Sequence, residues 1–110
     1  MGAAAKAVPV IHAPNFSLGV NLVFRVAGEV AKALGEGFDI EIVEAHHRGK
    51  RDAPSGTAGK LVEILSGTRG LNSRDVARLG RAGGALERSD EEIGVHSLRA
   101  GAVVGRHDLH

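Results

Sequence analysis

The sequence predicts an α+β fold in which one sheet carries its helices on one face. Apolar residues recur at steps of three and four in residues 18–34 and again in residues 58–65, which is the spacing of one side of a helix. Residues 38–42 alternate apolar and acidic side chains, as a half-buried strand does. Because the patterns follow the order helix, strand, helix, strand, strand, we expect one layered domain.

The first helix is predicted to run from Leu18 to Leu34. Ser17 precedes it and can cap it, because its hydroxyl can accept a hydrogen bond from a free N–H group of the first turn. Gly35 follows it and tolerates the left-handed backbone that often ends a helix. The apolar stripe expected to face the core consists of Leu22, Val23, Val26, Ala27, Val30, Ala31 and Leu34.

A strand is predicted over residues 38–45, followed by a polar loop over 46–55 and a second helix. The side of this second helix that should be buried carries Ala58, Leu61, Val62 and Leu65. Ser66 and Gly67 are expected to end it.

The remaining third of the chain is rich in glycine, arginine and glutamate. We expect a short helix over 73–79 capped by Ser73, and an exposed loop over 80–90 whose charges are solvated. Strands are predicted over 94–100 and 103–109.

Composition excludes several classes of protein. The 110 residues include 14 Lys and Arg against 13 Asp and Glu, and only 3% are aromatic. We therefore expect no nucleic-acid partner, since such proteins need a basic surface or aromatic stacking platforms. Cysteine is absent, which excludes disulfides and thiolate metal sites. No apolar run approaches the ~20 residues of a membrane span, so no membrane partner is expected either.

The candidate site lies at the exit of the first predicted strand. Residues 46–51 are mostly basic or imidazole side chains, and Ser55, Gly56 and Thr57 form the start of the second helix. Free N–H groups and the helix dipole attract an anion at such a position. From this pattern alone, a site for a small multiply charged anion and an ordinary solvated loop both remain open.

Metal binding is not expected. His46 and His47 are adjacent, and adjacent residues of a strand point to opposite faces. His107, Asp108 and His110 lie at the chain end and are expected to be a solvated tail. Ser55 lacks the surrounding pattern of a hydrolase nucleophile.

Three segments resemble the 4-hydroxy-tetrahydrodipicolinate reductase (dihydrodipicolinate reductase) family. Residues 41–58, EIVEAHHRGKRDAPSGTA, are similar to its signature motif. Residues 13–21, APNFSLGVN, look like the hinge that leaves its nucleotide-binding domain, and residues 93–105, IGVHSLRAGAVVG, look like its strand pair. The resemblance spans residues 8–109 and implies a mixed open sheet, part of the family's substrate-binding and tetramerisation domain.

The resemblance also implies an activity and roles for particular residues. The family is a cytoplasmic oxidoreductase of lysine and diaminopimelate biosynthesis, which uses NADPH or NADH to reduce dihydrodipicolinate, a cyclic unsaturated dicarboxylate, to tetrahydrodipicolinate. By position, His46 would donate a proton and Lys50 would assist it and hold a carboxylate. The other implied contacts are His47, Gly56 and Thr57 with the substrate, and Ala13, Pro14, Asn15 and Phe16 with the nicotinamide end of the cofactor.

By the same resemblance, residues 1–14 would be the end of a nucleotide-binding domain and its hinge. Residues 15–110 would be a C-terminally incomplete substrate-binding and oligomerisation domain, assembled as a homotetramer in the full-length protein. The glycine-rich turn of a dinucleotide-binding domain is absent from the sequence. We therefore expect no reductase activity from the chain alone. The alternatives are a catalytically inactive oligomerisation module and, ranked behind it, a His-based metal-binding protein.

Overall fold

The chain folds around an open four-stranded sheet with the strand order β2-β3-β1-β4. A computed structural model describes residues 2–13 and 15–110. The strands are β1 (Ile40–His46), β2 (Ala77–Leu79), β3 (Ile93–Arg99) and β4 (Arg106–Leu109). β1 and β2 both pair parallel with β3, whereas β4 pairs antiparallel with β1. The prediction of a mixed open sheet is confirmed.

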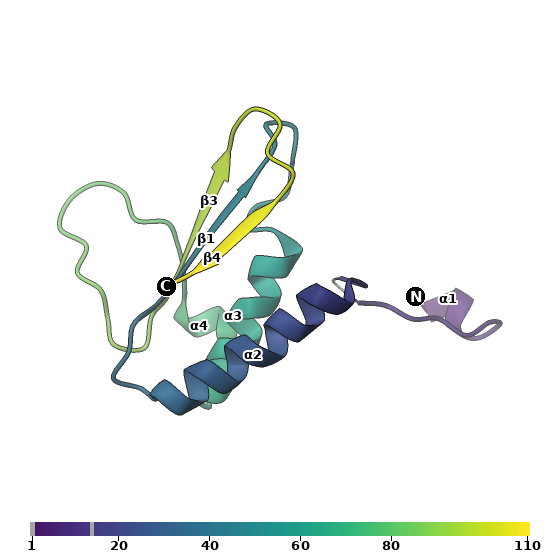
Figure 1. Ribbon diagram of the computed structural model, residues 1–110, viewed down its shortest axis with the longest axis horizontal. Helices are drawn as coiled ribbons and strands as arrows, with labels where there is room; N and C mark the ends of the chain where they lie inside the picture. The colour runs from purple at the N-terminus through teal and green to yellow at the C-terminus, as the bar shows by residue number, and fades with distance from the viewer. Residues whose placement is uncertain (1, 14) are drawn as a thin grey trace.

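Three helices lie on one side of this sheet, α2 (Leu18–Leu34), α3 (Gly56–Thr68) and α4 (Ser73–Val76) (Figure 1). The short α1 (Gly2–Ala5) lies apart from the sheet. α3 packs between the sheet and α2, and the segment before α2 extends away from the rest of the molecule (Figure 1). None of the helices in the described part of the chain is both long and apolar enough to cross a membrane.

The core forms where α3 meets the sheet. Ile40 and Ile42 of β1 point to the same side of the sheet because they stand two residues apart, and both are buried. Ile93 and Val95 of β3 pair with them in register and are buried too. The predicted buried side of α3 is confirmed, with Ala58, Leu61, Val62 and Leu65 all buried.

The ends of α2 and the start of α3 were predicted correctly. Ser17 caps α2, its hydroxyl accepting from the N–H of Val20 at 3.4 Å, and Gly35 follows the helix with a φ of 78°. Ser55 caps α3 in the same way, accepting from the N–H of Ala58 at 3.1 Å.

The predicted core stripe of α2 was right in part. Ala27 is buried and Ala31 packs against the core, but Leu22, Val23, Val26, Val30 and Leu34 are about half exposed. The side facing α3 instead carries Phe24 and Gly28. A Cβ on Gly28 would lie 3.1 Å from Ile64, so this glycine allows the two helices to approach closely. Apolar residues cover most of the circumference of α2, and their spacing therefore does not show which side is buried.

The region after α3 differs from the prediction in detail. The helix expected over 73–79 ends at Val76, and Ala77–Leu79 continue as β2, an edge strand beside β3. The last strand is shorter than predicted, beginning at Arg106. Three residues are too few to display an alternating pattern, and β2 forms because β3 offers it a parallel partner.

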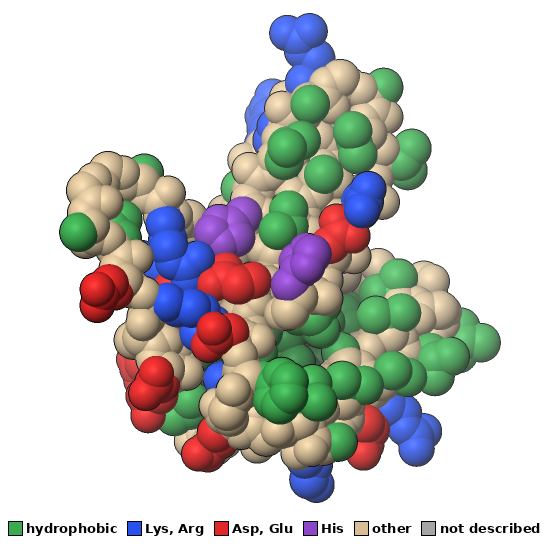
Figure 2. Space-filling view, turned by 60° about the vertical axis from the view of Figure 1, so that its left-hand side comes forward, with side chains coloured by type: hydrophobic (Ala, Val, Ile, Leu, Met, Phe, Trp, Pro, Cys, Tyr) green, Lys and Arg blue, Asp and Glu red, His purple; other side chains and the backbone are tan. Residues whose placement is uncertain are grey.

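The loop after β2 is anchored rather than freely solvated, contrary to prediction. Arg81 and Arg88 reach back from the loop to Glu41, with nitrogen–oxygen distances of 2.6 and 3.0 Å. Arg81 also pairs with Glu92, and His96 Nε2 lies 2.8 Å from Glu41. Acidic and basic side chains interleave where this loop meets the sheet (Figure 2).

Candidate functional site

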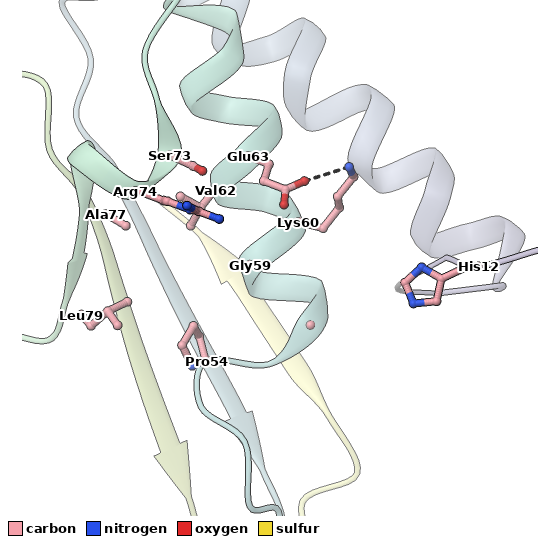
Figure 3. A pocket seen from close by; sticks show the side chains of 11 residues that line it. His12, Pro54, Gly59, Lys60, Val62, Glu63, Ser73, Arg74, Ala77 and Leu79 are labelled. Atoms are coloured by element: carbon pink, nitrogen blue, oxygen red, sulfur yellow. Dashed lines mark hydrogen bonds and ion pairs between the residues drawn. The ribbon is translucent and has the colours of Figure 1, made fainter. Parts of the chain in front are cut away.

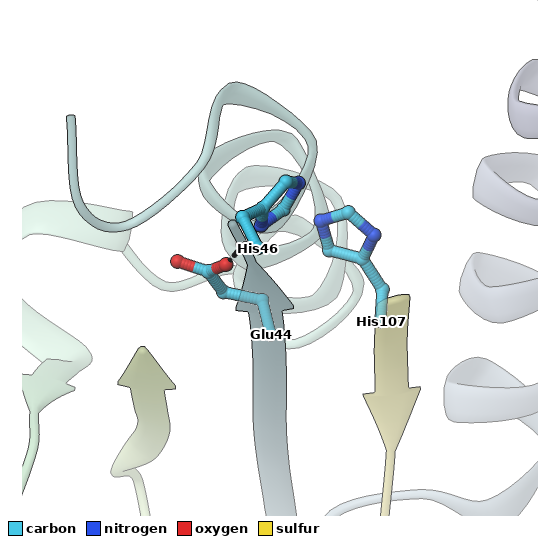
Figure 4. Close-up of side chains that lie close together, drawn as sticks. All are labelled: Glu44, His46 and His107. Carbon is cyan, nitrogen blue, oxygen red and sulfur yellow. Dashed lines mark hydrogen bonds and ion pairs between the residues drawn. The ribbon is translucent and has the colours of Figure 1, made fainter. Parts of the chain in front are cut away.

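The polar side chains of the site gather at the carboxyl end of β1, on the helix-covered side of the sheet. Glu44 and His46 continue the inward alternation that Ile40 and Ile42 begin, so the sheet turns both side chains inward. His107 reaches the same place from β4, which pairs with β1 so that His107 stands opposite Glu44 (Figure 4).

Glu44 is completely buried and is surrounded by hydrogen-bond donors. Arg99 of β3 donates to both carboxylate oxygens, Nη2 to Oε1 at 2.7 Å and Nη1 to Oε2 at 2.9 Å. The N–H of Ser55 donates to Oε1 at 3.2 Å. Burial alone would raise the pKa of the Glu44 carboxyl, but its hydrogen bonds, first that of Arg99, lower the pKa to about 2. Glu44 is therefore a buried carboxylate ion.

His46 is half-buried beside this carboxylate. Its Nδ1 lies 2.5 Å from Glu44 Oε2. On the other side of the ring, Nε2 faces Gly105, where an added Cβ would come within 3.1 Å of it. The rings of His46 and His107 meet edge to face, with centroids 5.2 Å apart and planes at 71°.

His107 joins β4 to the start of α3. Its Nε2 lies 2.7 Å from the hydroxyl oxygen of Ser55. Burial, and next the neighbouring His46, lower the pKa of His107, which favours the neutral ring. A neutral ring can accept the Ser55 hydroxyl proton while the hydroxyl oxygen caps α3. The prediction that His107 belongs to a solvated tail was therefore wrong.

Lys50 lies in the loop between β1 and α3, and its side chain is 21% exposed. Its Nζ donates to Asp52 Oδ1 at 2.8 Å. The backbone carbonyl of Asp52 accepts from Arg99 Nη2 at 2.8 Å, so the loop is tied to the same arginine that holds Glu44.

The other predicted substrate contacts lie around this loop. His47 is exposed just after β1, and its Nδ1 accepts from the N–H of Gly49 at 3.2 Å. Gly56 and Thr57 are the first residues of α3. The structure thus gathers His46, Lys50 and the start of α3 around the end of β1.

The predicted cofactor contacts lie in the segment before α2. Asn15 fixes this segment, because its Oδ1 accepts from the N–H of Ser17 at 2.7 Å and its carbonyl accepts from Asn21 Nδ2 at 3.1 Å. Ala13 is half-buried and Phe16 is 72% exposed. Pro14 lies outside the described residues. No hydrogen bond or ion pair between described residues joins this segment to the end of β1.

Glu44, His46 and His107 also have the composition of a metal-binding set, with one ligand atom from each lying within 4.8 Å of the others. The geometry opposes this use. Tetrahedral ligand atoms about 2.0–2.2 Å from an ion cannot stand as close as the 2.5 Å between His46 Nδ1 and Glu44 Oε2. Arg99 already neutralises the carboxylate, and His107 Nε2 is engaged by Ser55.

A groove of about 510 Å³ lies beside the first half of α3 (Figure 3). Its lining includes Pro54, Gly59, Lys60 and Arg74, and Lys60 pairs with Glu63 at 2.9 Å. Among the predicted site residues that the structure describes, Gly56 alone lines it. The groove is therefore next to the candidate site without containing it.

Sequence reasoning missed the roles of Arg99 and His107. A usable signal existed for Glu44: an acidic residue at the inward parity of Ile40 and Ile42 must find a buried cation. No local pattern identifies Arg99, which lies 55 residues away along the chain.

These features define an α+β domain with an open mixed sheet and a polar cluster at the carboxyl end of its parallel strand β1. The family model described as "Dihydrodipicolinate reductase, C-terminus" matches residues 19–110. The chain belongs to this family.

Curated relatives agree. The chain is 54% identical over 108 residues to 4-hydroxy-tetrahydrodipicolinate reductase of Myxococcus xanthus, a match that covers 96% of this chain and 39% of the relative. It is 55% identical over 104 residues to the reductase of Rubrobacter xylanophilus, covering 94% of this chain and 40% of that one. The chain therefore spans about two fifths of the length of these relatives.

A solved structure has the same fold. It is the dipicolinate-bound dihydrodipicolinate reductase from Paenisporosarcina sp. TG-14, with a TM-score of 0.62 and 29% identity. The match covers 88% of this chain and 36% of that one.

Proposed function

We propose that this chain supplies the substrate site for NAD(P)H-dependent reduction of dihydrodipicolinate to tetrahydrodipicolinate, a step of lysine and diaminopimelate biosynthesis. The observation that carries the proposal is the gathering of His46, Lys50 and the start of α3 around one end of β1. An imidazole, an ammonium group and a helix N-terminus together suit a small dicarboxylate that must also receive a proton. The similar Paenisporosarcina enzyme was solved with dipicolinate bound.

The carboxylates would be held by Lys50, His47 and the start of α3. Ser55 engages the N–H of Ala58 through its hydroxyl and that of Gly59 through its carbonyl. The N–H groups of Gly56 and Thr57 precede these in the first turn, where no intrahelical acceptor exists, and they are free to bind an anion. Lys50 would exchange Asp52 for the substrate.

His46 would deliver the proton, with Lys50 assisting. NAD(P)H, when bound, supplies the hydride, and the proton completes the two-electron reduction. The exposed ring of Phe16 fits an apolar contact with a nicotinamide, and Ala13 and Asn15 would stand beside it. These residues suit that end of the cofactor alone, because the sequence has no glycine-rich turn for its pyrophosphate.

In domain terms, residues 1–14 would be the end of a nucleotide-binding domain with its hinge, and residues 15–110 the substrate-binding and oligomerisation domain. We further propose that the domain self-associates, as a homotetramer in the full-length protein. Leu98 on the open side of the sheet is 50% exposed, and Val104 beyond β3 is 93% exposed. Figure 2 shows hydrophobic side chains on the part of the molecule that projects upward in that view. Exposed apolar patches of this kind often mark a contact between proteins.

The test is a chimera in which this chain replaces the matching segment of the Myxococcus xanthus reductase. We expect the chimera to oxidise NADPH or NADH in the presence of dihydrodipicolinate, whereas the chain alone shows no turnover. A folded chimera without activity would contradict the proposal. When the chain is titrated with dipicolinate, the amide NMR shifts of residues 46–58 should change. The variant Lys50→Ala should show smaller shift changes at the same dipicolinate concentration.

A further inference from the structure

We infer that Glu44 is a positioning residue, which holds the His46 imidazole with its proton on Nδ1 and leaves Nε2 as the ring nitrogen for proton exchange. The inference rests on the proposed role of His46 as proton donor. It adds a buried residue that would not touch the substrate. Four observations support it: burial, charge, hydrogen-bond direction and the space beside Nε2.

The direction of the Glu44–His46 hydrogen bond follows from charge. Glu44 is fully buried, and its pKa of about 2 keeps it ionised at neutral pH. An ionised carboxylate has no proton to donate, so at 2.5 Å the Nδ1 of His46 must be the donor. Neutral His46 is therefore the Nδ1–H tautomer, with its lone pair on Nε2.

Glu44 cannot turn away from His46, because its other positions are occupied by donors. Arg99 grips both oxygens, and the N–H of Ser55 donates to Oε1. Its side chain leaves the same face of β1 as His46, two residues earlier. The carboxylate thus fixes both the tautomer and the ring orientation, as carboxylates behind functional histidines do.

The space beside Nε2 agrees with this orientation. Gly105 stands there without a side chain, and a Cβ would lie 3.1 Å from Nε2. The opposite nitrogen is closed off by Glu44. One ring nitrogen is therefore committed to the protein, and the other faces a position kept clear of side-chain atoms.

The surroundings of Glu44 make Glu44→Gln a sharp test. Arg99 and the Ser55 N–H can only donate, so the new NH₂ group of a glutamine meets a donor at either of those contacts. An NH₂ group in place of Oε1 would meet two donors, whereas in place of Oε2 it would meet one, Arg99 Nη1, and there His46 can accept by moving its proton to Nε2. The hydroxyl of Ser97, which also bonds to Glu44, is the second group that can accept. We therefore expect Glu44→Gln to convert His46 from the Nδ1–H to the Nε2–H tautomer.

Glu41 provides a matched control on the same strand. It pairs with Arg81 and Arg88, lies 2.8 Å from His96 Nε2 and has a pKa of about 2, yet it points to the opposite face. Glu41→Gln removes a similar charge from a similar arginine–histidine cluster. It should leave the His46 tautomer unchanged.

The experiment is ¹⁵N NMR of the histidine rings in this chain and in the two variants. Predominant Nδ1–H in the wild-type chain, inversion in Glu44→Gln and no change in Glu41→Gln are expected. Nε2–H in the wild-type chain would overturn the inference, and so would a folded Glu44→Gln variant that keeps Nδ1–H. If Glu44→Gln fails to fold, the wild-type tautomer still decides.

Kinetics in the chimera separate this inference from the proposed function. To donate from Nε2, His46 must carry a proton on both nitrogens, and the Glu44 carboxylate lies against the Nδ1–H of that cationic ring. Glu44→Gln removes this negative charge and with it part of the roughly 10²–10⁴-fold that acid catalysis contributes, so it should lower kcat by at least about tenfold and change KM little. Glu41→Gln should change neither. An inactive wild-type chimera contradicts the proposed function while the NMR result stands. An active chimera whose kcat is insensitive to Glu44→Gln overturns the positioning role.

Discussion

The Nε2 atom of His107 lies 2.7 Å from the hydroxyl oxygen of Ser55, and this contact ties the antiparallel edge strand β4 to the first turn of α3. The same hydroxyl accepts the N–H of Ala58, so it can best serve both partners by donating its proton to a neutral His107. The start of α3, where the substrate carboxylates are proposed to bind, therefore depends on the charge of a histidine 52 residues away.

This dependence predicts a pH effect on stability. The pKa of His107 is lowered below its ordinary value of 6.5 by burial and then by His46. As the pH falls through 6.5, His107 of the unfolded chain binds a proton while His107 of the folded chain stays neutral. The free energy of unfolding therefore falls until the pH reaches the lower pKa that His107 has in the folded chain. Thermal melts above and below pH 6.5 should show this loss. The variant His107→Gln should show a smaller loss over the same range, and an identical loss would contradict the prediction.

A second prediction concerns Gly94 of β3, which pairs with Glu41 of β1 and lies under its carboxylate. A Cβ at this position would lie 1.8 Å from Glu41 Oε2, which Arg81 and His96 hold in place. Gly94→Ala must displace the carboxylate and break these contacts, so it should destabilise the chain by about 1–3 kcal/mol, the usual cost of overpacking. Denaturant unfolding measures this cost.

A double-mutant cycle gives the control for Gly94. With Glu41→Ala already present, the carboxylate that would collide is gone, and the further cost of Gly94→Ala should fall clearly below its cost in the parent chain. Equal costs in both backgrounds would show that Glu41 is not the obstacle.

Self-association through the open side of the sheet is the third prediction. Leu98→Asp places a charge on this surface and should shift the protein toward monomer in light scattering at micromolar concentration. Val26→Asp is the matched control, since Val26 is similarly exposed at 52% but lies on α2. A parent chain that is monomeric at this concentration would refute the prediction, and dissociation by Val26→Asp alone would assign the contact to α2.

Features that depend on neighbouring residues could be predicted from the sequence, whereas contacts between residues distant in the sequence could not. Ser17 was identified as a cap from the sequence because a cap depends on the residues beside it, whereas the cap expected at Ser73 is its neighbour Asn72. The alternation in β1 placed Ile40 and Ile42 correctly for the same reason. In contrast, Arg81 was assigned to solvent although it pairs with Glu41, 40 residues earlier. Such a partner is set by the register of the sheet, which no short pattern reveals.

The candidate site shows the same division. The motif around His46, Lys50 and Gly56 is continuous in the sequence, so the resemblance could locate it. Arg99 and His107 reach it from β3 and β4, and only the pairing of those strands with β1 brings them there. Apolar residues cover most of the circumference of α2, so their spacing did not identify the side that packs on α3, where Gly28 lies close to Ile64.

The last prediction distinguishes a specific substrate site from diffuse positive charge. Lys50 has a 21% exposed side chain and is bound to Asp52 at the end of β1, whereas its neighbour Arg51 is exposed and outside the proposed contacts. In the chimera, Lys50→Ala should lose a charge-assisted hydrogen bond of about 1.5–3 kcal/mol and part of the acid catalysis, raising KM and lowering kcat. Arg51→Ala removes an equal charge and should change both little.

The two histidines should divide the same effects between them. His46→Gln is expected to lower mainly kcat, because it removes the proton donor and leaves the carboxylate contacts in place. His47→Ala should act mostly through KM, since His47 would bind a carboxylate without supplying the proton. Steady-state kinetics of the four chimera variants, with thermal melts to confirm folding, measure this pattern. If a folded Arg51→Ala variant is as impaired as Lys50→Ala, the site responds to total charge alone, and the individual roles proposed for Lys50, His46 and His47 are wrong.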